Sequence, residues 1–286
     1  MKQKYKGIIC IIFAAFFFAL MSLFVRLAGD LPVFQKSFFR NLVAVAFATV
    51  VLLKNKTKVH LNKGDWGGLL LRSVFGTIGV LCNFYAVDHL LLADASILNK
   101  LSPFFALIMG SLILGEKLKP FQIGAVICAF TGAMLVIKPG SGIIATPAIV
   151  GLIGGCAAGT AYTFVRYLGK RGIAGPFIVF FFSAFSCVTI GPMMMLDYKP
   201  MTTQQLIFLL LAGLAAAGGQ FSVTAAYCYA PAREISVFDY SQILFSALFG
   251  FLIFNQLPDL LSWIGYGVIL VTAVANFIYN NKHSMA

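Results

Sequence analysis

The sequence predicts an all-α integral membrane protein in which ten transmembrane helices form two inverted five-helix repeats. Three observations support this fold class. The 286 residues are 60% hydrophobic and only 10% charged, whereas a soluble domain carries about 25% charged residues. Apolar runs of roughly 20 residues, the length that spans a bilayer, recur along the whole chain. The second half of the chain also repeats the pattern of the first.

Ten apolar runs predict the spans, and the polar breaks between them are too short to hold a soluble domain. The first run follows a lysine-rich start, as in a signal peptide, but it is longer than a typical signal-peptide core. We therefore expect it to be the first span. In chain order the runs cover about residues 7–28, 33–53, 66–87, 93–114, 121–138, 148–168, 175–196, 204–228, 234–254 and 260–280.

The placement of the cations predicts the orientation of the spans. Basic residues gather at alternate breaks, and the opposite breaks hold little beyond Lys138 and Lys199. Because cytoplasmic loops are enriched in Lys and Arg, we expect both termini in the cytoplasm and a multi-pass protein of the cell inner (plasma) membrane. The same pattern accounts for the net charge of +12, so we expect no nucleic-acid partner. The gathered cations are Lys2, Lys4, Lys6, Lys54, Lys56, Lys58, Lys63, Lys117, Lys119, Lys170, Arg171, Arg233 and Lys282.

An internal repeat divides the chain into two halves, about 1–140 and 147–286. Residues 83–118 (NFYAVDHLLLADASILNKLSPFFALIMGSLILGEKL) align without gaps with residues 222–257 (SVTAAYCYAPAREISVFDYSQILFSALFGFLIFNQL) at an offset of 139. Residues 23–30 similarly match 163–170. Since each half holds five spans, an odd number, the second half enters the membrane from the opposite side. Inverted repeats of this kind build many secondary transporters, with the substrate site near the midplane.

Several motifs resemble the drug/metabolite transporter (DMT) superfamily, EamA type, over essentially the whole chain. They are FFRNLVAV (38–45), LLLADASIL (90–98) with LSPFFALIMGSLILGEKL (101–118), and FDYSQILFSALFGFLIFNQLPD (238–259). The second copy departs from the family pattern, because Asn255 and Gln256 stand where Gly-Glu is usual. The resemblance implies two EamA-like repeats, with the first four and the sixth to ninth spans around a central cavity and the fifth and tenth outside. It also implies a carrier of small organic solutes.

Two opposite charges occupy equivalent positions of the repeats, Lys100 and Asp239. Charged side chains within a membrane usually face a cavity or a partner. One hypothesis is an ion pair that holds the halves together. A second is a zwitterion site, in which the two charges bind opposite ends of the substrate and Arg40 assists with its carboxylate. An anionic substrate held mainly by Arg40 and Lys100 is a third, and an ion pair that opens and closes as a gate combines the first two.

Further polar residues are candidates for the wall of the cavity, because aromatic walls with a few polar groups are typical of small-molecule pockets. Each could instead pack against lipid or another helix. Lys36 and Arg26 lie near the outer ends of their spans, where we expect them to extend to the membrane surface. The wall candidates are Asn83, Tyr85, Tyr162, Gln220, Tyr227 and Tyr240.

Proline and glycine predict where helices bend and approach. Pro103 removes a backbone hydrogen bond and is expected to bend the span at 93–114. Gly151, Gly155 and Gly159 form a small-residue stripe, as do Gly124, Cys128 and Gly132, and such stripes let helices pack closely. The second stripe could serve a homodimer, although packing within the chain is favoured. A monomer and a homodimer both stay open.

Motifs of catalysis and metal binding are absent from the sequence. All six cysteines fall inside spans without CxxC spacing, and there is no HExxH, GxSxG or Walker A sequence. We therefore expect no enzyme, cofactor or metal, but a secondary active transporter that moves a small organic metabolite by alternating access around the central cavity. A zwitterion such as an amino acid is the favoured substrate; the alternatives are an anionic metabolite or vitamin, and a channel. Protons are one candidate for the coupling ion, with Asp239 as their carrier.

Overall fold

The computed structural model describes residues 2–55, 61–115, 119–138, 145–229 and 236–282. Within these ranges every regular element is a helix, and ten membrane-spanning helices are present by length and composition. Each coincides with one of the apolar runs, so the predicted spans are confirmed. The elements are α1 Lys2–Leu27, α2 Val33–Lys54, α3 Lys63–His89, α4 Leu92–Asn99, α5 Ser102–Leu114, α6 Pro120–Ile137, α7 Ala145–Lys170, α8 Gly175–Leu196, α9 Thr203–Tyr229, η2 Ser236–Tyr240, α11 Ser241–Phe254 and α12 Leu260–Lys282.

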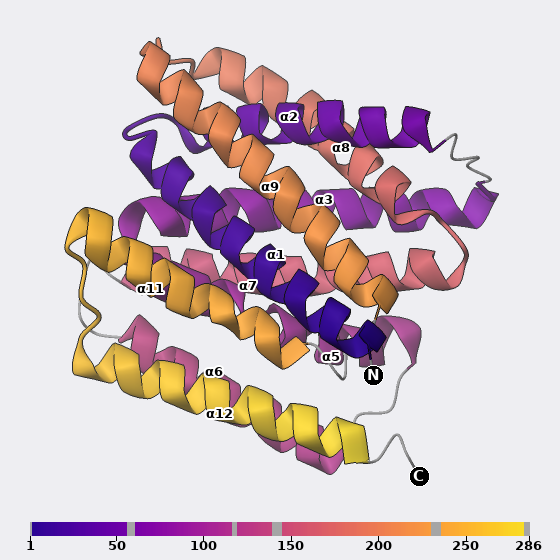
Figure 1. Ribbon diagram of the computed structural model, residues 1–286, viewed down its shortest axis with the longest axis vertical. Helices are drawn as coiled ribbons and strands as arrows, with labels where there is room; N and C mark the ends of the chain where they lie inside the picture. Colours follow the sequence, from indigo (N-terminus) through magenta and orange to yellow (C-terminus); the bar gives the residue numbers. More distant parts are fainter. Residues whose placement is uncertain (1, 56–60, 116–118, 139–144, 230–235, 283–286) are drawn as a thin grey trace.

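The two halves of the chain are interleaved. The most extensive helix contacts join one half to the other, in the pairs α1 with α9, α3 with α7, α6 with α12 and α2 with α8. Figure 1 shows α12 beside α6 and α1 beside α9, and it shows that α1 begins and α12 ends at the same end of the bundle. We call this the terminal end and the opposite one the distal end. Because the main contacts cross between halves, the space at the centre belongs to both repeats.

Two of the spans are broken at equivalent positions. In the first half α4 ends at Asn99 and α5 begins at Ser102, so Lys100 and Leu101 form the break. In the second half the 3₁₀ helix η2 gives way to α11 at Tyr240. The expected bend at Pro103 is thus a break, and Pro103 lies in the first turn of α5. A proline there costs no hydrogen bond, because the first N–H groups of a helix have no partner within it.

The glycine stripe of α7 lies against the first break. A Cβ atom on Gly155 would stand 2.6 Å from the carbonyl oxygen of Leu98, and one on Gly159 would stand 2.5 Å from that of Ser102. Only glycine permits this approach of two backbones, so the expected close packing is confirmed here. Gly132 of the second stripe likewise packs on Gly265 of α12, whereas a Cβ atom on Gly124 would meet nothing within 4 Å and Cys128 is exposed.

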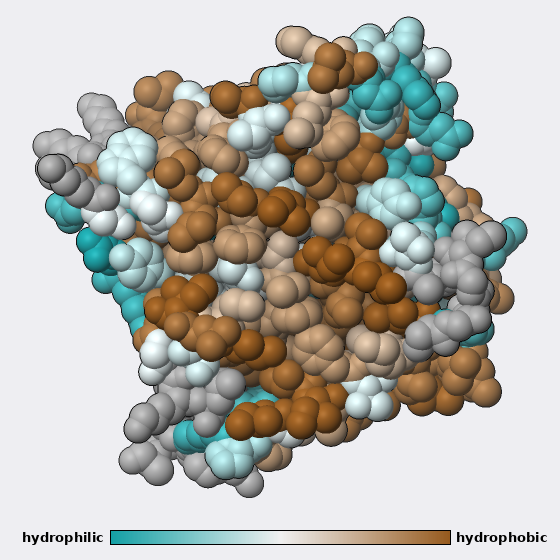
Figure 2. All heavy atoms as spheres, turned by 180° about the vertical axis from the view of Figure 1, so that it is seen from behind, coloured by the Kyte–Doolittle hydropathy of each residue, from teal (hydrophilic) through white to brown (hydrophobic). Residues whose placement is uncertain are grey.

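Apolar side chains cover the outside of the bundle. Hydrophobic residues occupy the centre of the face in Figure 2, and hydrophilic ones gather at its ends. Large apolar side chains such as Leu112 (73% exposed) and Val188 (74% exposed) point outward. A soluble protein rarely exposes apolar patches of this size, so the surface is that of a multi-pass membrane protein.

Candidate functional site

A cavity of about 90 Å³ lies between the two halves. Its wall comes from α1, α2, α3, α4, α7, α8, α9 and α11, while α6 and α12 contribute none of the described residues that line it. This is the arrangement that the sequence resemblance implied, with the fifth and tenth spans outside. The break after α4 brings Asn99 and Lys100 to the wall, because the chain leaves the helical path there.

Five of the nine predicted site residues line this cavity. They come from four helices and from the break after α4, which explains why no single stretch of sequence marks the site. Asn83 reaches the wall from α3. This helix packs closely on α7 through glycines and other small residues. The five are Arg40, Asn83, Lys100, Tyr162 and Gln220.

Three of the other four predicted residues lie outside the wall. Asp239 pairs with Lys100 and Tyr240 is buried, but neither lines the cavity. Tyr85 stacks on His89 with ring centroids 4.2 Å apart. It is turned roughly 200° around α3 from Asn83, and the structure thus corrects its placement in the wall. The side chain of Tyr227 lies outside the described part of the structure.

Lys100 and Asp239 meet in an ion pair. The Lys100 Nζ atom lies 2.6 Å from Oδ2 of Asp239, and the side chains are 7% and 21% exposed. Lys100 follows the last residue of α4, and Asp239 precedes the first turn of α11. A cation at a helix C-terminus and an anion at an N-terminus are both favoured by the helix dipoles. The pair therefore joins the two broken spans, one from each repeat.

Two arginines of the wall have no acidic partner among the residues that the structure describes. Arg40 is 3% exposed and Arg72 is 5% exposed. Their guanidinium carbons lie 6.0 and 4.2 Å from the centroid of the same ring, Phe182, which favours both cations by a cation–π interaction. In the ion pairs that the described residues form, the cations are Lys36, Lys100, Lys138 and Arg171. The positive charges of Arg40 and Arg72 are thus uncompensated within the described chain.

Arg72 was not predicted from the sequence, although the rule that selected Arg40 applies to it. It stands inside an apolar run, and such a charge faces a cavity or partner. Its position depends on Gly76, one turn further along α3. A Cβ atom there would meet Nη1 of Arg72 at 2.1 Å and the Phe182 ring at 2.8 Å. The missing side chain leaves room for the guanidinium to lie between helix and ring.

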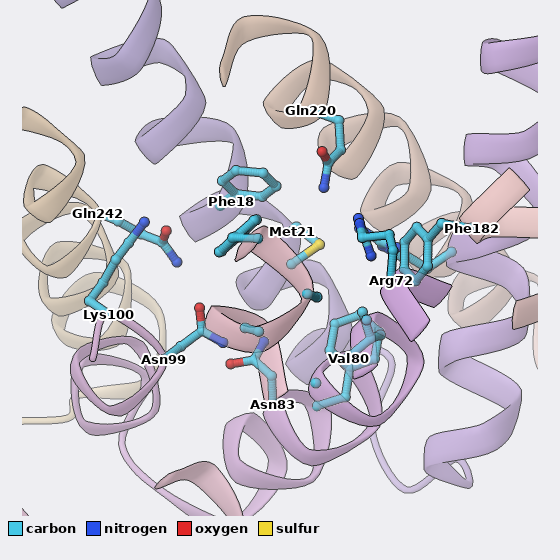
Figure 3. A pocket seen from close by; sticks show the side chains of 17 residues that line it. Phe18, Met21, Arg72, Val80, Asn83, Asn99, Lys100, Phe182, Gln220 and Gln242 are labelled. Atoms are coloured by element: carbon cyan, nitrogen blue, oxygen red, sulfur yellow. The ribbon is translucent and has the colours of Figure 1, made fainter. Parts of the chain in front are cut away.

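Amide side chains complete the wall. Figure 3 shows Lys100 and Gln242 on one side of the cavity and Arg72 and Phe182 on the other, with Gln220 projecting toward the space from α9. Asn83 and Asn99 lie between the two sides in the same view. Asn99 and Gln242 were not predicted, because a single amide near a helix break carries no sequence signal. The wall can therefore form hydrogen bonds at several points around a small polar ligand.

Polar contacts hold the helices together at the distal end. The Nζ atom of Lys36 lies 2.6 Å from Oδ1 of Asp88, and Lys36 is 1% exposed. The expectation that Lys36 extends to the surface is therefore wrong, because a partner on α3 lies within its reach. Gln35 forms two hydrogen bonds with the backbone of Lys199, and Arg26 donates to the carbonyl oxygens of Val87 and Leu90. These contacts tie α1, α2 and α3 to one another and to the α8–α9 connection.

The sequence is similar to those of named transporters, and the fold matches that of a solved structure. A pseudopaline exporter, CntI, of Pseudomonas aeruginosa (strain UCBPP-PA14) is 32% identical over 94% of this chain and 95% of its own length. A riboflavin transporter of Rhizobium johnstonii is 28% identical over 74% of this chain and 70% of its own length. A solved crystal structure at 15% identity matches the fold with a TM-score of 0.67, covering 96% of this chain and 98% of that one.

The profile of one family accounts for both halves. It is described as the EamA-like transporter family, and it matches residues 5–138 and again residues 146–278. Both matches cover five spans and leave the segment between the halves outside. Together with the ten membrane-spanning helices and the similarity to named transporters, this match shows that the chain belongs to the EamA-like transporter family of the DMT superfamily.

Proposed function

We propose that this protein is a secondary active transporter that moves a small organic metabolite through the central cavity. The observation that carries the proposal is the cavity itself, which lies between the repeats, is lined by residues of eight helices and includes charged and amide side chains in its wall. Transporters built from inverted repeats bind substrate at such a place. Export is the proposed direction, because the relative that is 32% identical is named as an exporter.

Alternating access supplies the proposed mechanism. The contacts of Lys36 with Asp88 and of Gln35 with Lys199 close the distal end above the cavity. Opening that end requires these contacts to break, while the two halves rock around the bound substrate. The Lys100–Asp239 pair crosses between the halves at the level of the cavity, so we propose that it also opens and closes during the cycle.

Proton coupling through Asp239 belongs to the same proposal. Its Oδ1 atom is buried and accepts no hydrogen bond, so that Lys100 is the main partner of its charge. When the pair opens, an uncompensated buried carboxylate is costly, and taking up a proton removes that cost.

We also propose the inner (plasma) membrane as the location, cytoplasmic termini, and repeat boundaries at 1–140 and 147–286. A monomer and a homodimer stay open.

Metabolite profiling tests the proposal. The protein is produced in a bacterial host, and the small molecules of cytosol and medium are compared with those of a host that carries an empty vector. We expect at least one organic metabolite to change its distribution across the membrane, with a flux that saturates as its concentration rises. An unchanged profile, or a flux that rises linearly with concentration as through a channel, would contradict a carrier.

A further inference from the structure

The charges around the cavity do not balance. Lys100, Arg40 and Arg72 line it, and among the described residues the one acid paired with any of them is Asp239, which compensates Lys100 from outside the wall. No carboxylate of the described residues lines the cavity. The wall thus carries two positive charges that nothing in the described chain neutralises, and both belong to side chains that are at least nine-tenths buried.

The two guanidinium groups are also short of hydrogen-bond acceptors. Nη1 of Arg40 donates to Oδ1 of Asn41 at 2.6 Å, which fixes the orientation of the group. The Nε atoms of Arg40 and Arg72 are buried and make no hydrogen bond. Burying a charged donor without an acceptor costs several kcal/mol in general. Two such groups beside one ring are therefore arranged to receive an acceptor from outside the chain.

We propose that Arg40 and Arg72 form a subsite for an oxyanion, the carboxylate or phosphate group of the transported metabolite. The planar forks of arginine match the oxygens of both groups, and Phe182 holds the two guanidinium groups on one side of the cavity. Asn83, Asn99 and Gln242 then face the remainder of the molecule. This inference rests on the proposed function and specifies the substrate class: a compact organic anion, bound opposite the Lys100–Asp239 pair.

An oxyanion subsite favours an anionic substrate over a zwitterion, two substrate classes that the sequence left open. A zwitterion site at Lys100 and Asp239 requires two charges that are free to bind substrate, but these two bind each other at 2.6 Å. Arg40 and Arg72 meet the requirement for an anion. Lys100 lies on the other side of the cavity in Figure 3, where it remains available to a second acidic group when its pair with Asp239 opens.

Thermal unfolding of the detergent-purified protein tests the subsite without a known substrate. The probes are succinate, its uncharged diamide, inorganic phosphate and choline, each added at equal ionic strength. A ligand that binds only the folded state raises the apparent stability by an amount that grows with the ratio of its free concentration to its dissociation constant. We expect succinate or phosphate, but neither the diamide nor choline, to raise the unfolding temperature, and the stronger of the two distinguishes a carboxylate from a phosphate site.

Variants locate the effect. Arg40→Gln and Arg72→Gln should each weaken oxyanion binding by at least about tenfold, the value of a lost charge-assisted hydrogen bond. Arg166→Gln is the matched control, because Arg166 is an exposed arginine of neighbouring α7 that does not line the cavity. Without ligand, the Arg72→Gln variant should unfold at no lower temperature than the wild type, since it loses an uncompensated buried charge. If Arg72 had only a structural role, its replacement would lower the unfolding temperature.

Two results would overturn the subsite. One is an absence of any shift with either oxyanion in the wild type. The other is an equal shift in Arg40→Gln, Arg72→Gln and the wild type. If the proposed function alone fails, oxyanions still bind to the wild type but no solute shows saturable flux. If the subsite alone fails, a neutral or cationic solute is transported and the arginine variants bind it as the wild type does.

Discussion

Lys100 and Asp239 stand 139 residues apart, at equivalent positions of the two repeats, and their side chains meet at 2.6 Å. Each lies at a helix break, so the pair links the two discontinuous spans on which the cavity wall depends. Removing one partner of a buried ion pair generally costs about 3–5 kcal/mol, because it leaves the other charge uncompensated. Replacing both partners together costs much less.

This difference gives the first prediction. Lys100→Met and Asp239→Asn should each lower the unfolding temperature clearly, and the double variant should recover most of the loss. A double-mutant cycle measured by thermal unfolding in detergent checks it. If Asp239→Asn alone melts with the wild type, the pair does not stabilise this conformation.

Gly76→Ala should displace the Arg72 guanidinium without changing any charge. The added methyl would meet Nη1 of Arg72 and the Phe182 ring, so the side chain has to leave its place beside the ring. Gly67→Ala is the control, because it lies in the same helix and its Cβ atom meets nothing within 4 Å. Both changes favour the helix by about 1 kcal/mol. We expect the oxyanion shift to be lost in Gly76→Ala alone; its persistence there would argue against the assigned position of Arg72.

Gly159→Ala should destabilise the protein. Its Cβ atom would meet the backbone oxygen of Ser102 at 2.5 Å, and backbone at a helix break cannot move away as a side-chain end can. Overpacking of this kind costs roughly 1–3 kcal/mol. Gly169→Ala in the same helix meets nothing within 4 Å and should be tolerated. Equal unfolding temperatures for the two variants would contradict the close approach of α7 to the break.

Asp259 gives a prediction for pH. Its carboxylate accepts hydrogen bonds from the Lys138 ammonium and the Ser262 backbone N–H, and these lower its pKa from 3.8 to about 2. A lowered pKa in the folded state contributes stability that is fully present above the unfolded value and is lost as the pH falls through the folded value. The wild type should therefore be more stable than Asp259→Asn from pH 7 down to about pH 4, and the difference should disappear toward pH 2. A difference that is already lost at pH 5 would contradict this pKa.

The orientation in the membrane has a direct test. The alternating cations predict that both termini lie in the cytoplasm. A reporter fused after Ala286 that is active only in the cytoplasm should be active, and the same reporter inserted between the halves, after residue 142, should be silent. The reverse pattern would contradict the cytoplasmic placement of both termini.

The sequence was sufficient for much of the fold. Ten spans follow from apolar runs of bilayer length. The offset of 139 sets Lys100 and Asp239 at equivalent positions, and the ion pair they form was one of the hypotheses for them. The sequence could not show the features that depend on contacts between helices distant in the chain. Lys36 is buried because Asp88 lies within its reach, and Tyr85 stacks on His89 on the side of α3 away from Asn83. Pro103 looks the same in sequence whether it bends a helix or begins one.

The same reason explains why the cavity was predicted only in part. Arg40 and Lys100 were selected because a charge inside an apolar run requires a cavity or partner. Arg40 and Arg72 both lie beside the ring of Phe182, which is on a third helix. The sequence holds 28 other phenylalanines. No local pattern distinguishes that ring from one that faces lipid.

Flux into proteoliposomes tests whether an oxyanion crosses the membrane through the arginine-lined cavity. Wild type, Arg72→Gln and Arg166→Gln are reconstituted at equal amounts, and uptake of the radiolabelled oxyanion that stabilises the wild type best is measured over a range of concentrations. We expect saturable uptake by the wild type and Arg166→Gln. In Arg72→Gln, we expect the uptake rate at low concentration to fall by at least about tenfold. Equal uptake by all three proteins, or uptake that never saturates, would contradict transport through the arginine-lined cavity.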